Sequence, residues 1–134
     1  MIDRRQLPTR RNHTTQKLRV GGQRTLYVSV HQDPQPAEIF LRVKGAGCDS
    51  ETIALYDVVA RLLSLALQYG APLEKTAEML HQTKFEPAGQ VTGHDRIKHC
   101  SSLPDLIGRY LLLEYCNRED VAHVQAEASQ QETA

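Results

Sequence analysis

The residues best suited to binding chemistry lie in one stretch, residues 84–98, which has neither a helical nor a strand period. It combines cations, an aromatic side chain, a carboxylate, glycines and a proline, so side chains or a partner must fix its backbone. Cationic side chains can bind a phosphate group, and glycines let backbone N–H groups approach the same phosphate. The candidate ligand- or phosphate-binding residues here and in the N-terminal region are Arg10, Arg11, Lys84, Glu86, Gly93, Arg96 and Lys98.

The same stretch can instead be a structural clip. In that case Glu86 accepts hydrogen bonds from nearby backbone donors and Phe85 packs into the core. No Walker or G-x-G-x-x-G pattern is present, so the motif is not specific for nucleotides. Both interpretations stay open, and the residues assigned to the structural motif are Phe85, Pro87, Gly89, Ser102, Pro104 and Asp105.

Metal and nucleophile chemistry have little support in the sequence. Cys48, Cys100 and Cys116 form no C-x-x-C pair, which excludes a local redox dithiol or zinc knuckle. The six histidines include no pair with zinc-helix spacing and a third ligand, and nothing supplies a catalytic triad. We therefore expect no metal site, no catalytic residues and no cofactor bound by this chain alone.

Composition is typical of one soluble domain. The 134 residues are 40% apolar and 24% charged, with a net charge of zero. No signal peptide and no apolar run of membrane-spanning length is visible, and the cysteines fit a reducing compartment, so we expect a cytoplasmic protein without membrane contact. Charge is unevenly distributed: residues 1–14 form a basic arm, and residues 117–134 form an acidic and polar tail that we expect to be frayed or disordered.

Periodicity between these ends predicts an α+β domain over residues 15–116. Three strands with period-2 alternation lie within residues 16–44, and Gly21-Gly22 supplies the tight turn of the first hairpin. About three helices follow, near residues 51–68, 72–81 and 102–116, the last opened by an S-x-x-D capping pattern. The sequence thus predicts a three-stranded antiparallel sheet with the helices packed on one face. Basic and aromatic residues on its other face are interpreted as an ordinary polar surface, and a nucleic acid partner is not expected.

The first predicted helix is apolar over most of its surface. Its polar positions form one narrow stripe at Asp57, Arg61, Ser64 and Gln68. A three-stranded sheet covers only one flank of such a helix. The apolar surface of the helix that the sheet leaves uncovered predicts either a homodimer or binding to a larger protein. The alternative is that the chain buries this surface within its own core.

Several short motifs, in order along the chain, resemble one family. They include Val20-Gly21-Gly22, Glu38-Ile39-Phe40, Phe85-Glu86-Pro87, Thr92-Gly93, Arg96-Ile97-Lys98 and Ser101-Ser102-Leu103-Pro104-Asp105. Together they are similar to the TSCPD domain, the C-terminal domain of adenosylcobalamin-dependent (class II) ribonucleotide reductases. The resemblance covers roughly residues 7–115. In the signature itself, Ser, Pro and Asp match, whereas Thr and Cys do not.

The resemblance implies an accessory domain. The radical chemistry of the family takes place in a large barrel that uses adenosylcobalamin, and this chain has no room for that barrel. The expected function is therefore a detached C-terminal domain that acts in trans on a catalytic subunit, as a component of deoxyribonucleotide synthesis for DNA replication, and is not catalytic alone. The alternative is a small dimeric nucleotide-binding protein, a sensor or sponge, that uses residues 84–98 and nearby basic residues.

Overall fold

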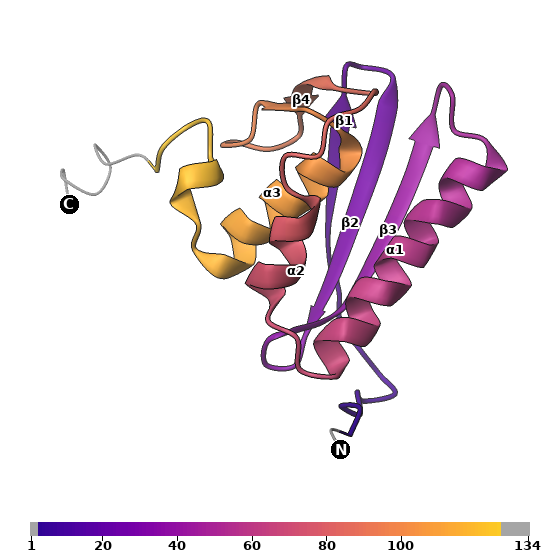
Figure 1. Ribbon diagram of the computed structural model, residues 1–134, viewed down its shortest axis with the longest axis vertical. Helices are drawn as coiled ribbons and strands as arrows, with labels where there is room; N and C mark the ends of the chain where they lie inside the picture. Colours follow the sequence, from indigo (N-terminus) through magenta and orange to yellow (C-terminus); the bar gives the residue numbers. More distant parts are fainter. Residues whose placement is uncertain (1–2, 127–134) are drawn as a thin grey trace.

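The computed structural model describes residues 3–126 and confirms the α+β class. Three strands, two helices, two short strands and a third helix follow one another along the chain, and the helices lie on one side of the sheet (Figure 1). The elements in order are β1 (Thr14–Val20), β2 (Arg24–Gln32), β3 (Pro36–Gly45), α1 (Ser50–Gln68), α2 (Leu73–Leu80), β4 (Gly89–Thr92), β5 (His99–Cys100), α3 (Leu103–Cys116) and the 3-10 helix η1 (Glu119–Val121).

The sheet has five antiparallel strands in the order β3-β2-β1-β4-β5, rather than the three predicted. β4 lies within residues 84–98, which were expected to lack regular structure, and β5 follows directly after them. β4 pairs with the free edge of β1 through Arg19↔Thr92 and Val20↔Val91. β4 and β5 span only four and two residues, which is too short for a period-2 pattern to be visible.

Alternation along β1, β2 and β3 separates a buried face from an exposed one, as predicted. The inward positions are Leu18, Val20, Leu26, Val28, Val30, Ile39, Leu41 and Val43. The charged side chains of Lys17, Arg19, Arg42 and Lys44 are exposed on the other face. The core therefore lies between the sheet and the helices, and apolar residues of α1 and α3 complete it.

Local capping fixes the helix starts. Asp49 Oδ1 accepts a hydrogen bond of 2.8 Å from the backbone N–H of Thr52 at the start of α1. Ser102 Oγ accepts one of 2.9 Å from the N–H of Asp105 at the start of α3, with Pro104 in the first turn. Both helices begin where the sequence predicted them.

Only part of the polar stripe of α1 faces solvent. Ser64 and Gln68 are buried and point toward β3, an edge strand of the sheet. Ser64 Oγ accepts from the N–H of Ile39 at 2.8 Å and donates to its carbonyl oxygen at 3.1 Å, and Gln68 donates to the carbonyl of Ala37 at 3.0 Å. These side chains satisfy backbone groups that β2 cannot reach. Some apolar residues of α1, including Leu55 and Leu62, consequently face outward, while Leu63 and Leu67 pack in the core.

The segments flanking the predicted domain are attached to it. Arg5 donates its backbone N–H to the carbonyl of Gln68, while Val121 and Ala122 are buried beside η1. The prediction of a frayed or disordered tail falls partly on residues 127–134, which lie outside the described residues. Among the residues described, no helix combines the length and the apolar character needed to span a membrane.

Candidate functional site

Two serine side chains just before α3 hold the segment that follows α2. The carbonyl oxygen of Thr83 accepts hydrogen bonds from Ser101 Oγ at 2.8 Å and from Ser102 Oγ at 2.7 Å. The backbone N–H of Phe85 then donates to the carbonyl of Ser101 at 3.1 Å. The segment that carries the Phe85-Glu86-Pro87 motif is therefore tied to the N-terminus of α3.

Asp105 is the centre of this arrangement, and its side chain is fully buried. Oδ1 accepts from the backbone N–H of Gln82 and contacts His81 Nδ1 at 3.1 Å, while Oδ2 accepts from the N–H of Ser101 at 3.0 Å. Arg109, one turn further along α3, lies 3.6 Å from the same carboxylate. One carboxylate thus connects the end of α2, the residue before the cap and α3 itself.

The electrostatics of Asp105 follow from these contacts. Burial favours the neutral acid, but the hydrogen bonds from the N–H groups of Ser101 and Gln82 outweigh it, with Arg109 and His81 adding attraction. The pKa of Asp105 therefore lies below its ordinary value of 3.8. The ionised carboxylate is the form that holds this part of the fold at neutral pH.

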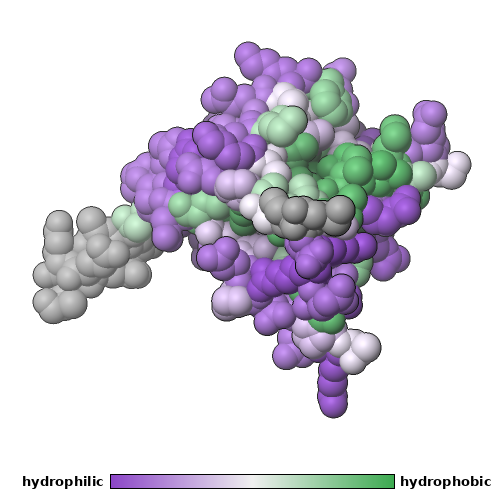
Figure 2. Space-filling model, turned by 60° about the horizontal axis from the view of Figure 1, so that its bottom comes forward, coloured by the Kyte–Doolittle hydropathy of each residue, from purple (hydrophilic) through white to green (hydrophobic). Residues whose placement is uncertain are grey.

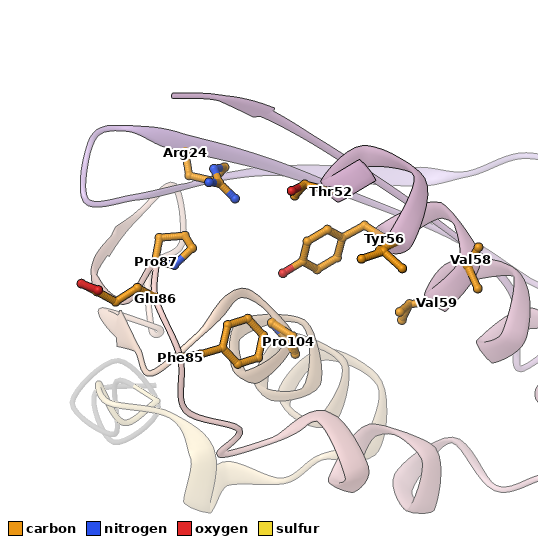
Figure 3. A pocket seen from close by; sticks show the side chains of 10 residues that line it. Arg24, Thr52, Tyr56, Val58, Val59, Phe85, Glu86, Pro87 and Pro104 are labelled. Atoms are coloured by element: carbon orange, nitrogen blue, oxygen red, sulfur yellow. The ribbon is translucent and has the colours of Figure 1, made fainter. Parts of the chain in front are cut away.

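A pocket of about 450 Å³ lies between α1 and the segment that Asp105 and Ser102 hold in place. Figure 3 shows the ring of Tyr56 in its middle, with Phe85 and Pro104 on one side and Arg24 and Thr52 on the other. Most of the lining is apolar. The lining residues are Arg24, Thr52, Leu55, Tyr56, Val58, Val59, Phe85, Glu86, Pro87 and Pro104.

Phe85 and Glu86 do not act as the clip interpretation expected. Phe85 is 53% exposed and forms a wall of the pocket instead of packing in the core. Glu86 is exposed and accepts no hydrogen bond from any described residue. The clip exists, but Thr83, Ser101 and Asp105 form it.

Two polar residues of the pocket, Arg24 and Tyr56, were not identified as site residues from the sequence. Arg24 opens β2, outside any motif named in the sequence, and Tyr56 lies in a largely aliphatic stretch of α1. Each is only 9% exposed. Burial raises the pKa of Tyr56, and the nearby Arg24 opposes that rise, so the hydroxyl stays protonated at neutral pH.

The candidate phosphate-binding residues are spread over the molecule. Glu86 lines the pocket described above, Gly93 and Arg96 line a second of about 200 Å³, and Arg11 lines a third of about 180 Å³. Lys84 and Arg10 are exposed. The phosphate-binding role of this set stays a prediction, but its members do not meet in one of these pockets.

Several of those residues already have partners in the chain. Arg96 pairs with Glu119, Lys98 Nζ donates to the carbonyl of His94 at 3.0 Å, and Arg11 pairs with Glu38 at 2.9 Å. A phosphate would have to compete with each of these contacts. Gly93 has a backbone reason for being glycine, because its φ is +101° and a Cβ would lie 2.4 Å from the carbonyl oxygen of Lys17.

Metal and thiol chemistry find no site in the described part of the chain. No group of three or more His, Cys, Asp or Glu side chains within residues 3–126 could hold a metal ion. Burial raises the pKa of Cys100 to about 11, with the charge of Asp105 adding to the effect. The thiol is therefore protonated at neutral pH and a poor nucleophile.

An apolar seam runs along the outer face of α1. Its members follow one another at alternating spacings of three and four residues, which places them on one face of the helix. They are exposed by 38% to 61%, although all are large and apolar. Figure 2 shows hydrophobic side chains gathered on the side of the molecule where α1 lies in Figure 1. The α1 seam consists of Leu55, Val58, Leu62, Leu65 and Tyr69.

Comparison with known proteins points to one family. The model of the TSCPD domain matches residues 3–115. The chain is 42% identical over 123 residues to the vitamin B12-dependent ribonucleotide reductase of Agrobacterium fabrum, a match that covers 91% of this chain and 10% of that protein. The corresponding reductase of Bradyrhizobium diazoefficiens is 38% identical over 125 residues, covering 92% and 10%.

A more distant relative shows the same proportions. The vitamin B12-dependent ribonucleotide reductase of Rhodopirellula baltica is 32% identical over 118 residues, covering 87% of this chain and 11% of that protein. The chain thus spans about a tenth of the length of these curated relatives. No solved structure matches it. The resemblance noted in the sequence is confirmed, and the chain belongs to the TSCPD domain family.

Proposed function

We propose that this chain is an accessory binding module that acts in trans on the catalytic subunit of a vitamin B12-dependent ribonucleotide reductase. Its relatives carry the matching region as about a tenth of a much larger protein. In such a protein the other nine-tenths is the neighbour against which the domain would pack. A TSCPD domain made as a smaller chain would need to bind that neighbour noncovalently.

The observation that carries the proposal is the α1 seam. Five large apolar side chains at helical spacing lie exposed on a helix whose polar side chains, Ser64 and Gln68, are used inward. Contiguous exposed apolar surface of this kind is typical of a protein interface. Leu62, which is 61% exposed at the centre of the seam, is the side chain whose burial would contribute most.

The arginines near the N-terminus would assist the encounter. The described part of the basic arm, residues 3–14, contains four arginines against one acid, and Arg10 is exposed. Surface charge of one sign accelerates association with an acidic partner and loses its effect at high salt. The seam would supply affinity, and the basic arm would supply the rate of association.

The test is binding and rescue. The Agrobacterium fabrum reductase, produced without the region that matches this chain, is mixed with the full chain, and both complex formation and nucleotide reduction are measured. We expect binding and a gain in activity, and Leu62→Glu should weaken binding about tenfold or more because it places a charge in the apolar interface. Arg42→Ser, an exposed change on the opposite face of the sheet, is the matched control and should bind normally.

Two results would overturn the proposal: no complex and no rescue, or a complex that Leu62→Glu leaves intact. Light scattering on the isolated chain tests whether a second copy of the chain, rather than the reductase, covers the seam. A homodimer through the seam would give twice the monomer mass and become monomeric in Leu62→Glu. The alternative of a nucleotide sensor gains no support of this kind, since Arg11, Arg96 and Lys98 already have partners within the chain.

A further inference from the structure

Arg24 is a buried cation that lacks an anionic partner. It is 9% exposed, and Nε and Nη2 donate to a single neutral acceptor, the carbonyl oxygen of Ala46, at 3.2 and 3.1 Å. Within residues 3–126 it forms no ion pair, and Nη1 donates to no described residue. Asp49, whose pKa Arg24 lowers only as the last of several causes, is exposed and caps α1. The unpaired part of the guanidinium is not fully enclosed but borders the pocket, so an anion that enters the pocket can pair with it.

A second donor faces the same space. Figure 3 shows the hydroxyl of Tyr56 pointing to the side of the pocket on which Arg24 and Pro87 lie. This hydroxyl makes no hydrogen bond with a described residue, although Tyr56 is only 9% exposed. The hydroxyl and the guanidinium both line the pocket and have no anionic partner among the described residues, so a carboxylate bound there can accept hydrogen bonds from both.

The rest of the pocket is apolar. Figure 3 shows Phe85, Pro87 and Pro104 on one side and Val59 of α1 on the other, and Leu55 of α1 also lines the pocket. A volume of about 450 Å³ lies within the range of small-molecule sites, which are mainly apolar with a few placed polar groups. The body of a ligand would therefore be hydrophobic and compact.

Glu86 restricts the charge of the ligand. Its side chain lies at the rim, and Figure 3 shows its carboxylate pointing away from Tyr56 and out of the pocket. Its negative charge does not neutralise Arg24 at the pocket floor, but it opposes entry of a group with several negative charges. A monoanion is favoured over a nucleoside di- or triphosphate.

We propose that the pocket between α1 and residues 85–87 binds a small monocarboxylate with an aromatic or branched aliphatic body. The carboxylate accepts from Arg24 and Tyr56, and the apolar body lies between Phe85, Pro104 and Val59. The site shares Leu55 and Val58 with one end of the α1 seam, whereas Leu62, Leu65 and Tyr69 do not line it. Binding to the isolated chain does not depend on docking onto a reductase, so the two proposals are tested separately.

The experiment uses the full chain alone, labelled with ¹⁵N and titrated with 3-phenylpropionate. We expect the amide signals of Thr52, Tyr56 and Phe85 to shift in a saturable way. The uncharged 3-phenylpropionamide, which has the same shape, should bind at least about tenfold more weakly because it lacks the charge that Arg24 pairs with. Inorganic phosphate and AMP form the other arms and should leave these signals unchanged.

Variants then test the two donors. Arg24→Gln should abolish the preference for the acid over the amide, and Tyr56→Phe should weaken binding of the acid several-fold while the fold is retained. Arg19→Gln, an exposed arginine on the neighbouring strand, is the control and should change nothing. If Arg24→Gln does not fold, the proposal is still tested by Tyr56→Phe and by comparing the affinities of the unmodified chain for 3-phenylpropionate and 3-phenylpropionamide. Equal affinity for acid and amide, no saturable shift at the pocket, or stronger shifts with AMP would each overturn the proposal.

Discussion

Asp105 on α3 accepts a hydrogen bond from the backbone N–H of Gln82, a residue with a φ of +69° just beyond the end of α2. A positive φ is unfavourable for a side chain of this size, so an outside contact must hold it. The same carboxylate accepts from Ser101, which ties the strained residue to the start of α3. Residues 85–87, which form a wall of the pocket, begin three residues after Gln82, so the position of this wall depends on the buried carboxylate of Asp105.

Replacing Asp105 by alanine should strongly destabilise the fold. The change leaves the partly buried N–H groups of Gln82 and Ser101 without their acceptor and leaves Arg109 without its anion. We expect a loss of about 3 kcal/mol in the free energy of unfolding, measured by urea denaturation. Asp57→Ala, at an exposed site on α1, is the control and should stay within about 0.5 kcal/mol. Equal stability of the two variants would contradict the role assigned to Asp105.

Acid should remove the same contribution in the unmodified protein. The pKa of Asp105 is lowered in the folded state, so its stabilisation is fully present above the ordinary value of 3.8 and is lost as the pH falls through the lower folded pKa. The difference in unfolding free energy between the unmodified chain and Asp105→Asn should be constant above about pH 5 and shrink below pH 3.8. Subtracting the variant cancels the exposed carboxylates. A difference that grows toward acid would show the opposite sign and refute this assignment.

The features that the sequence predicted well are those encoded by neighbouring residues. Gly21-Gly22 and the alternation of Leu26, Val28 and Val30 fix the hairpin, because turn geometry and strand period are encoded in adjacent residues. The Ser102 cap is encoded within four residues in the same way. β4 was missed because its structure depends on the edge of β1, about seventy residues earlier, and not on its own four residues.

The orientation of α1 shows a second limit. Ser64 and Gln68 have the spacing of a solvent-facing stripe, yet they are buried because the edge of β3 offers them backbone partners. Periodicity identifies a face of the helix but not the side on which that face lies. The pocket residues Arg24 and Tyr56 were missed for a related reason, since they come from different elements and only the fold brings them together.

Ser64→Ala should therefore cost more than a typical surface serine. It leaves the N–H and carbonyl of Ile39 without their partner at a buried edge. We expect a decrease of about 1–3 kcal/mol in the free energy of unfolding. Ser29→Ala is the control, because its hydroxyl bonds only Thr15 on the outer face of the sheet, and it should change stability by about 0.5 kcal/mol or less. If both serines behave alike, α1 does not satisfy the edge of β3 as described.

Gly108→Ala tests how closely α2 and α3 approach. A Cβ at Gly108 would lie 2.7 Å from both the carbonyl oxygen of Ala77 and the backbone N of His81, and these backbone atoms cannot move without shifting α2. Helix propensity alone would make alanine more stable by about 1 kcal/mol. We expect instead a loss of about 1–3 kcal/mol from overpacking, so the sign of the change decides between the two effects. Ala54→Gly, at an exposed site of α1, measures the propensity contribution separately and should cost about 1 kcal/mol. Because α2 leads directly into residues 82–87, Gly108→Ala should also weaken the binding of 3-phenylpropionate, whereas Ala54→Gly should not. A Gly108→Ala variant that is more stable than the unmodified chain and binds the ligand equally well would contradict the close packing of α2 and α3.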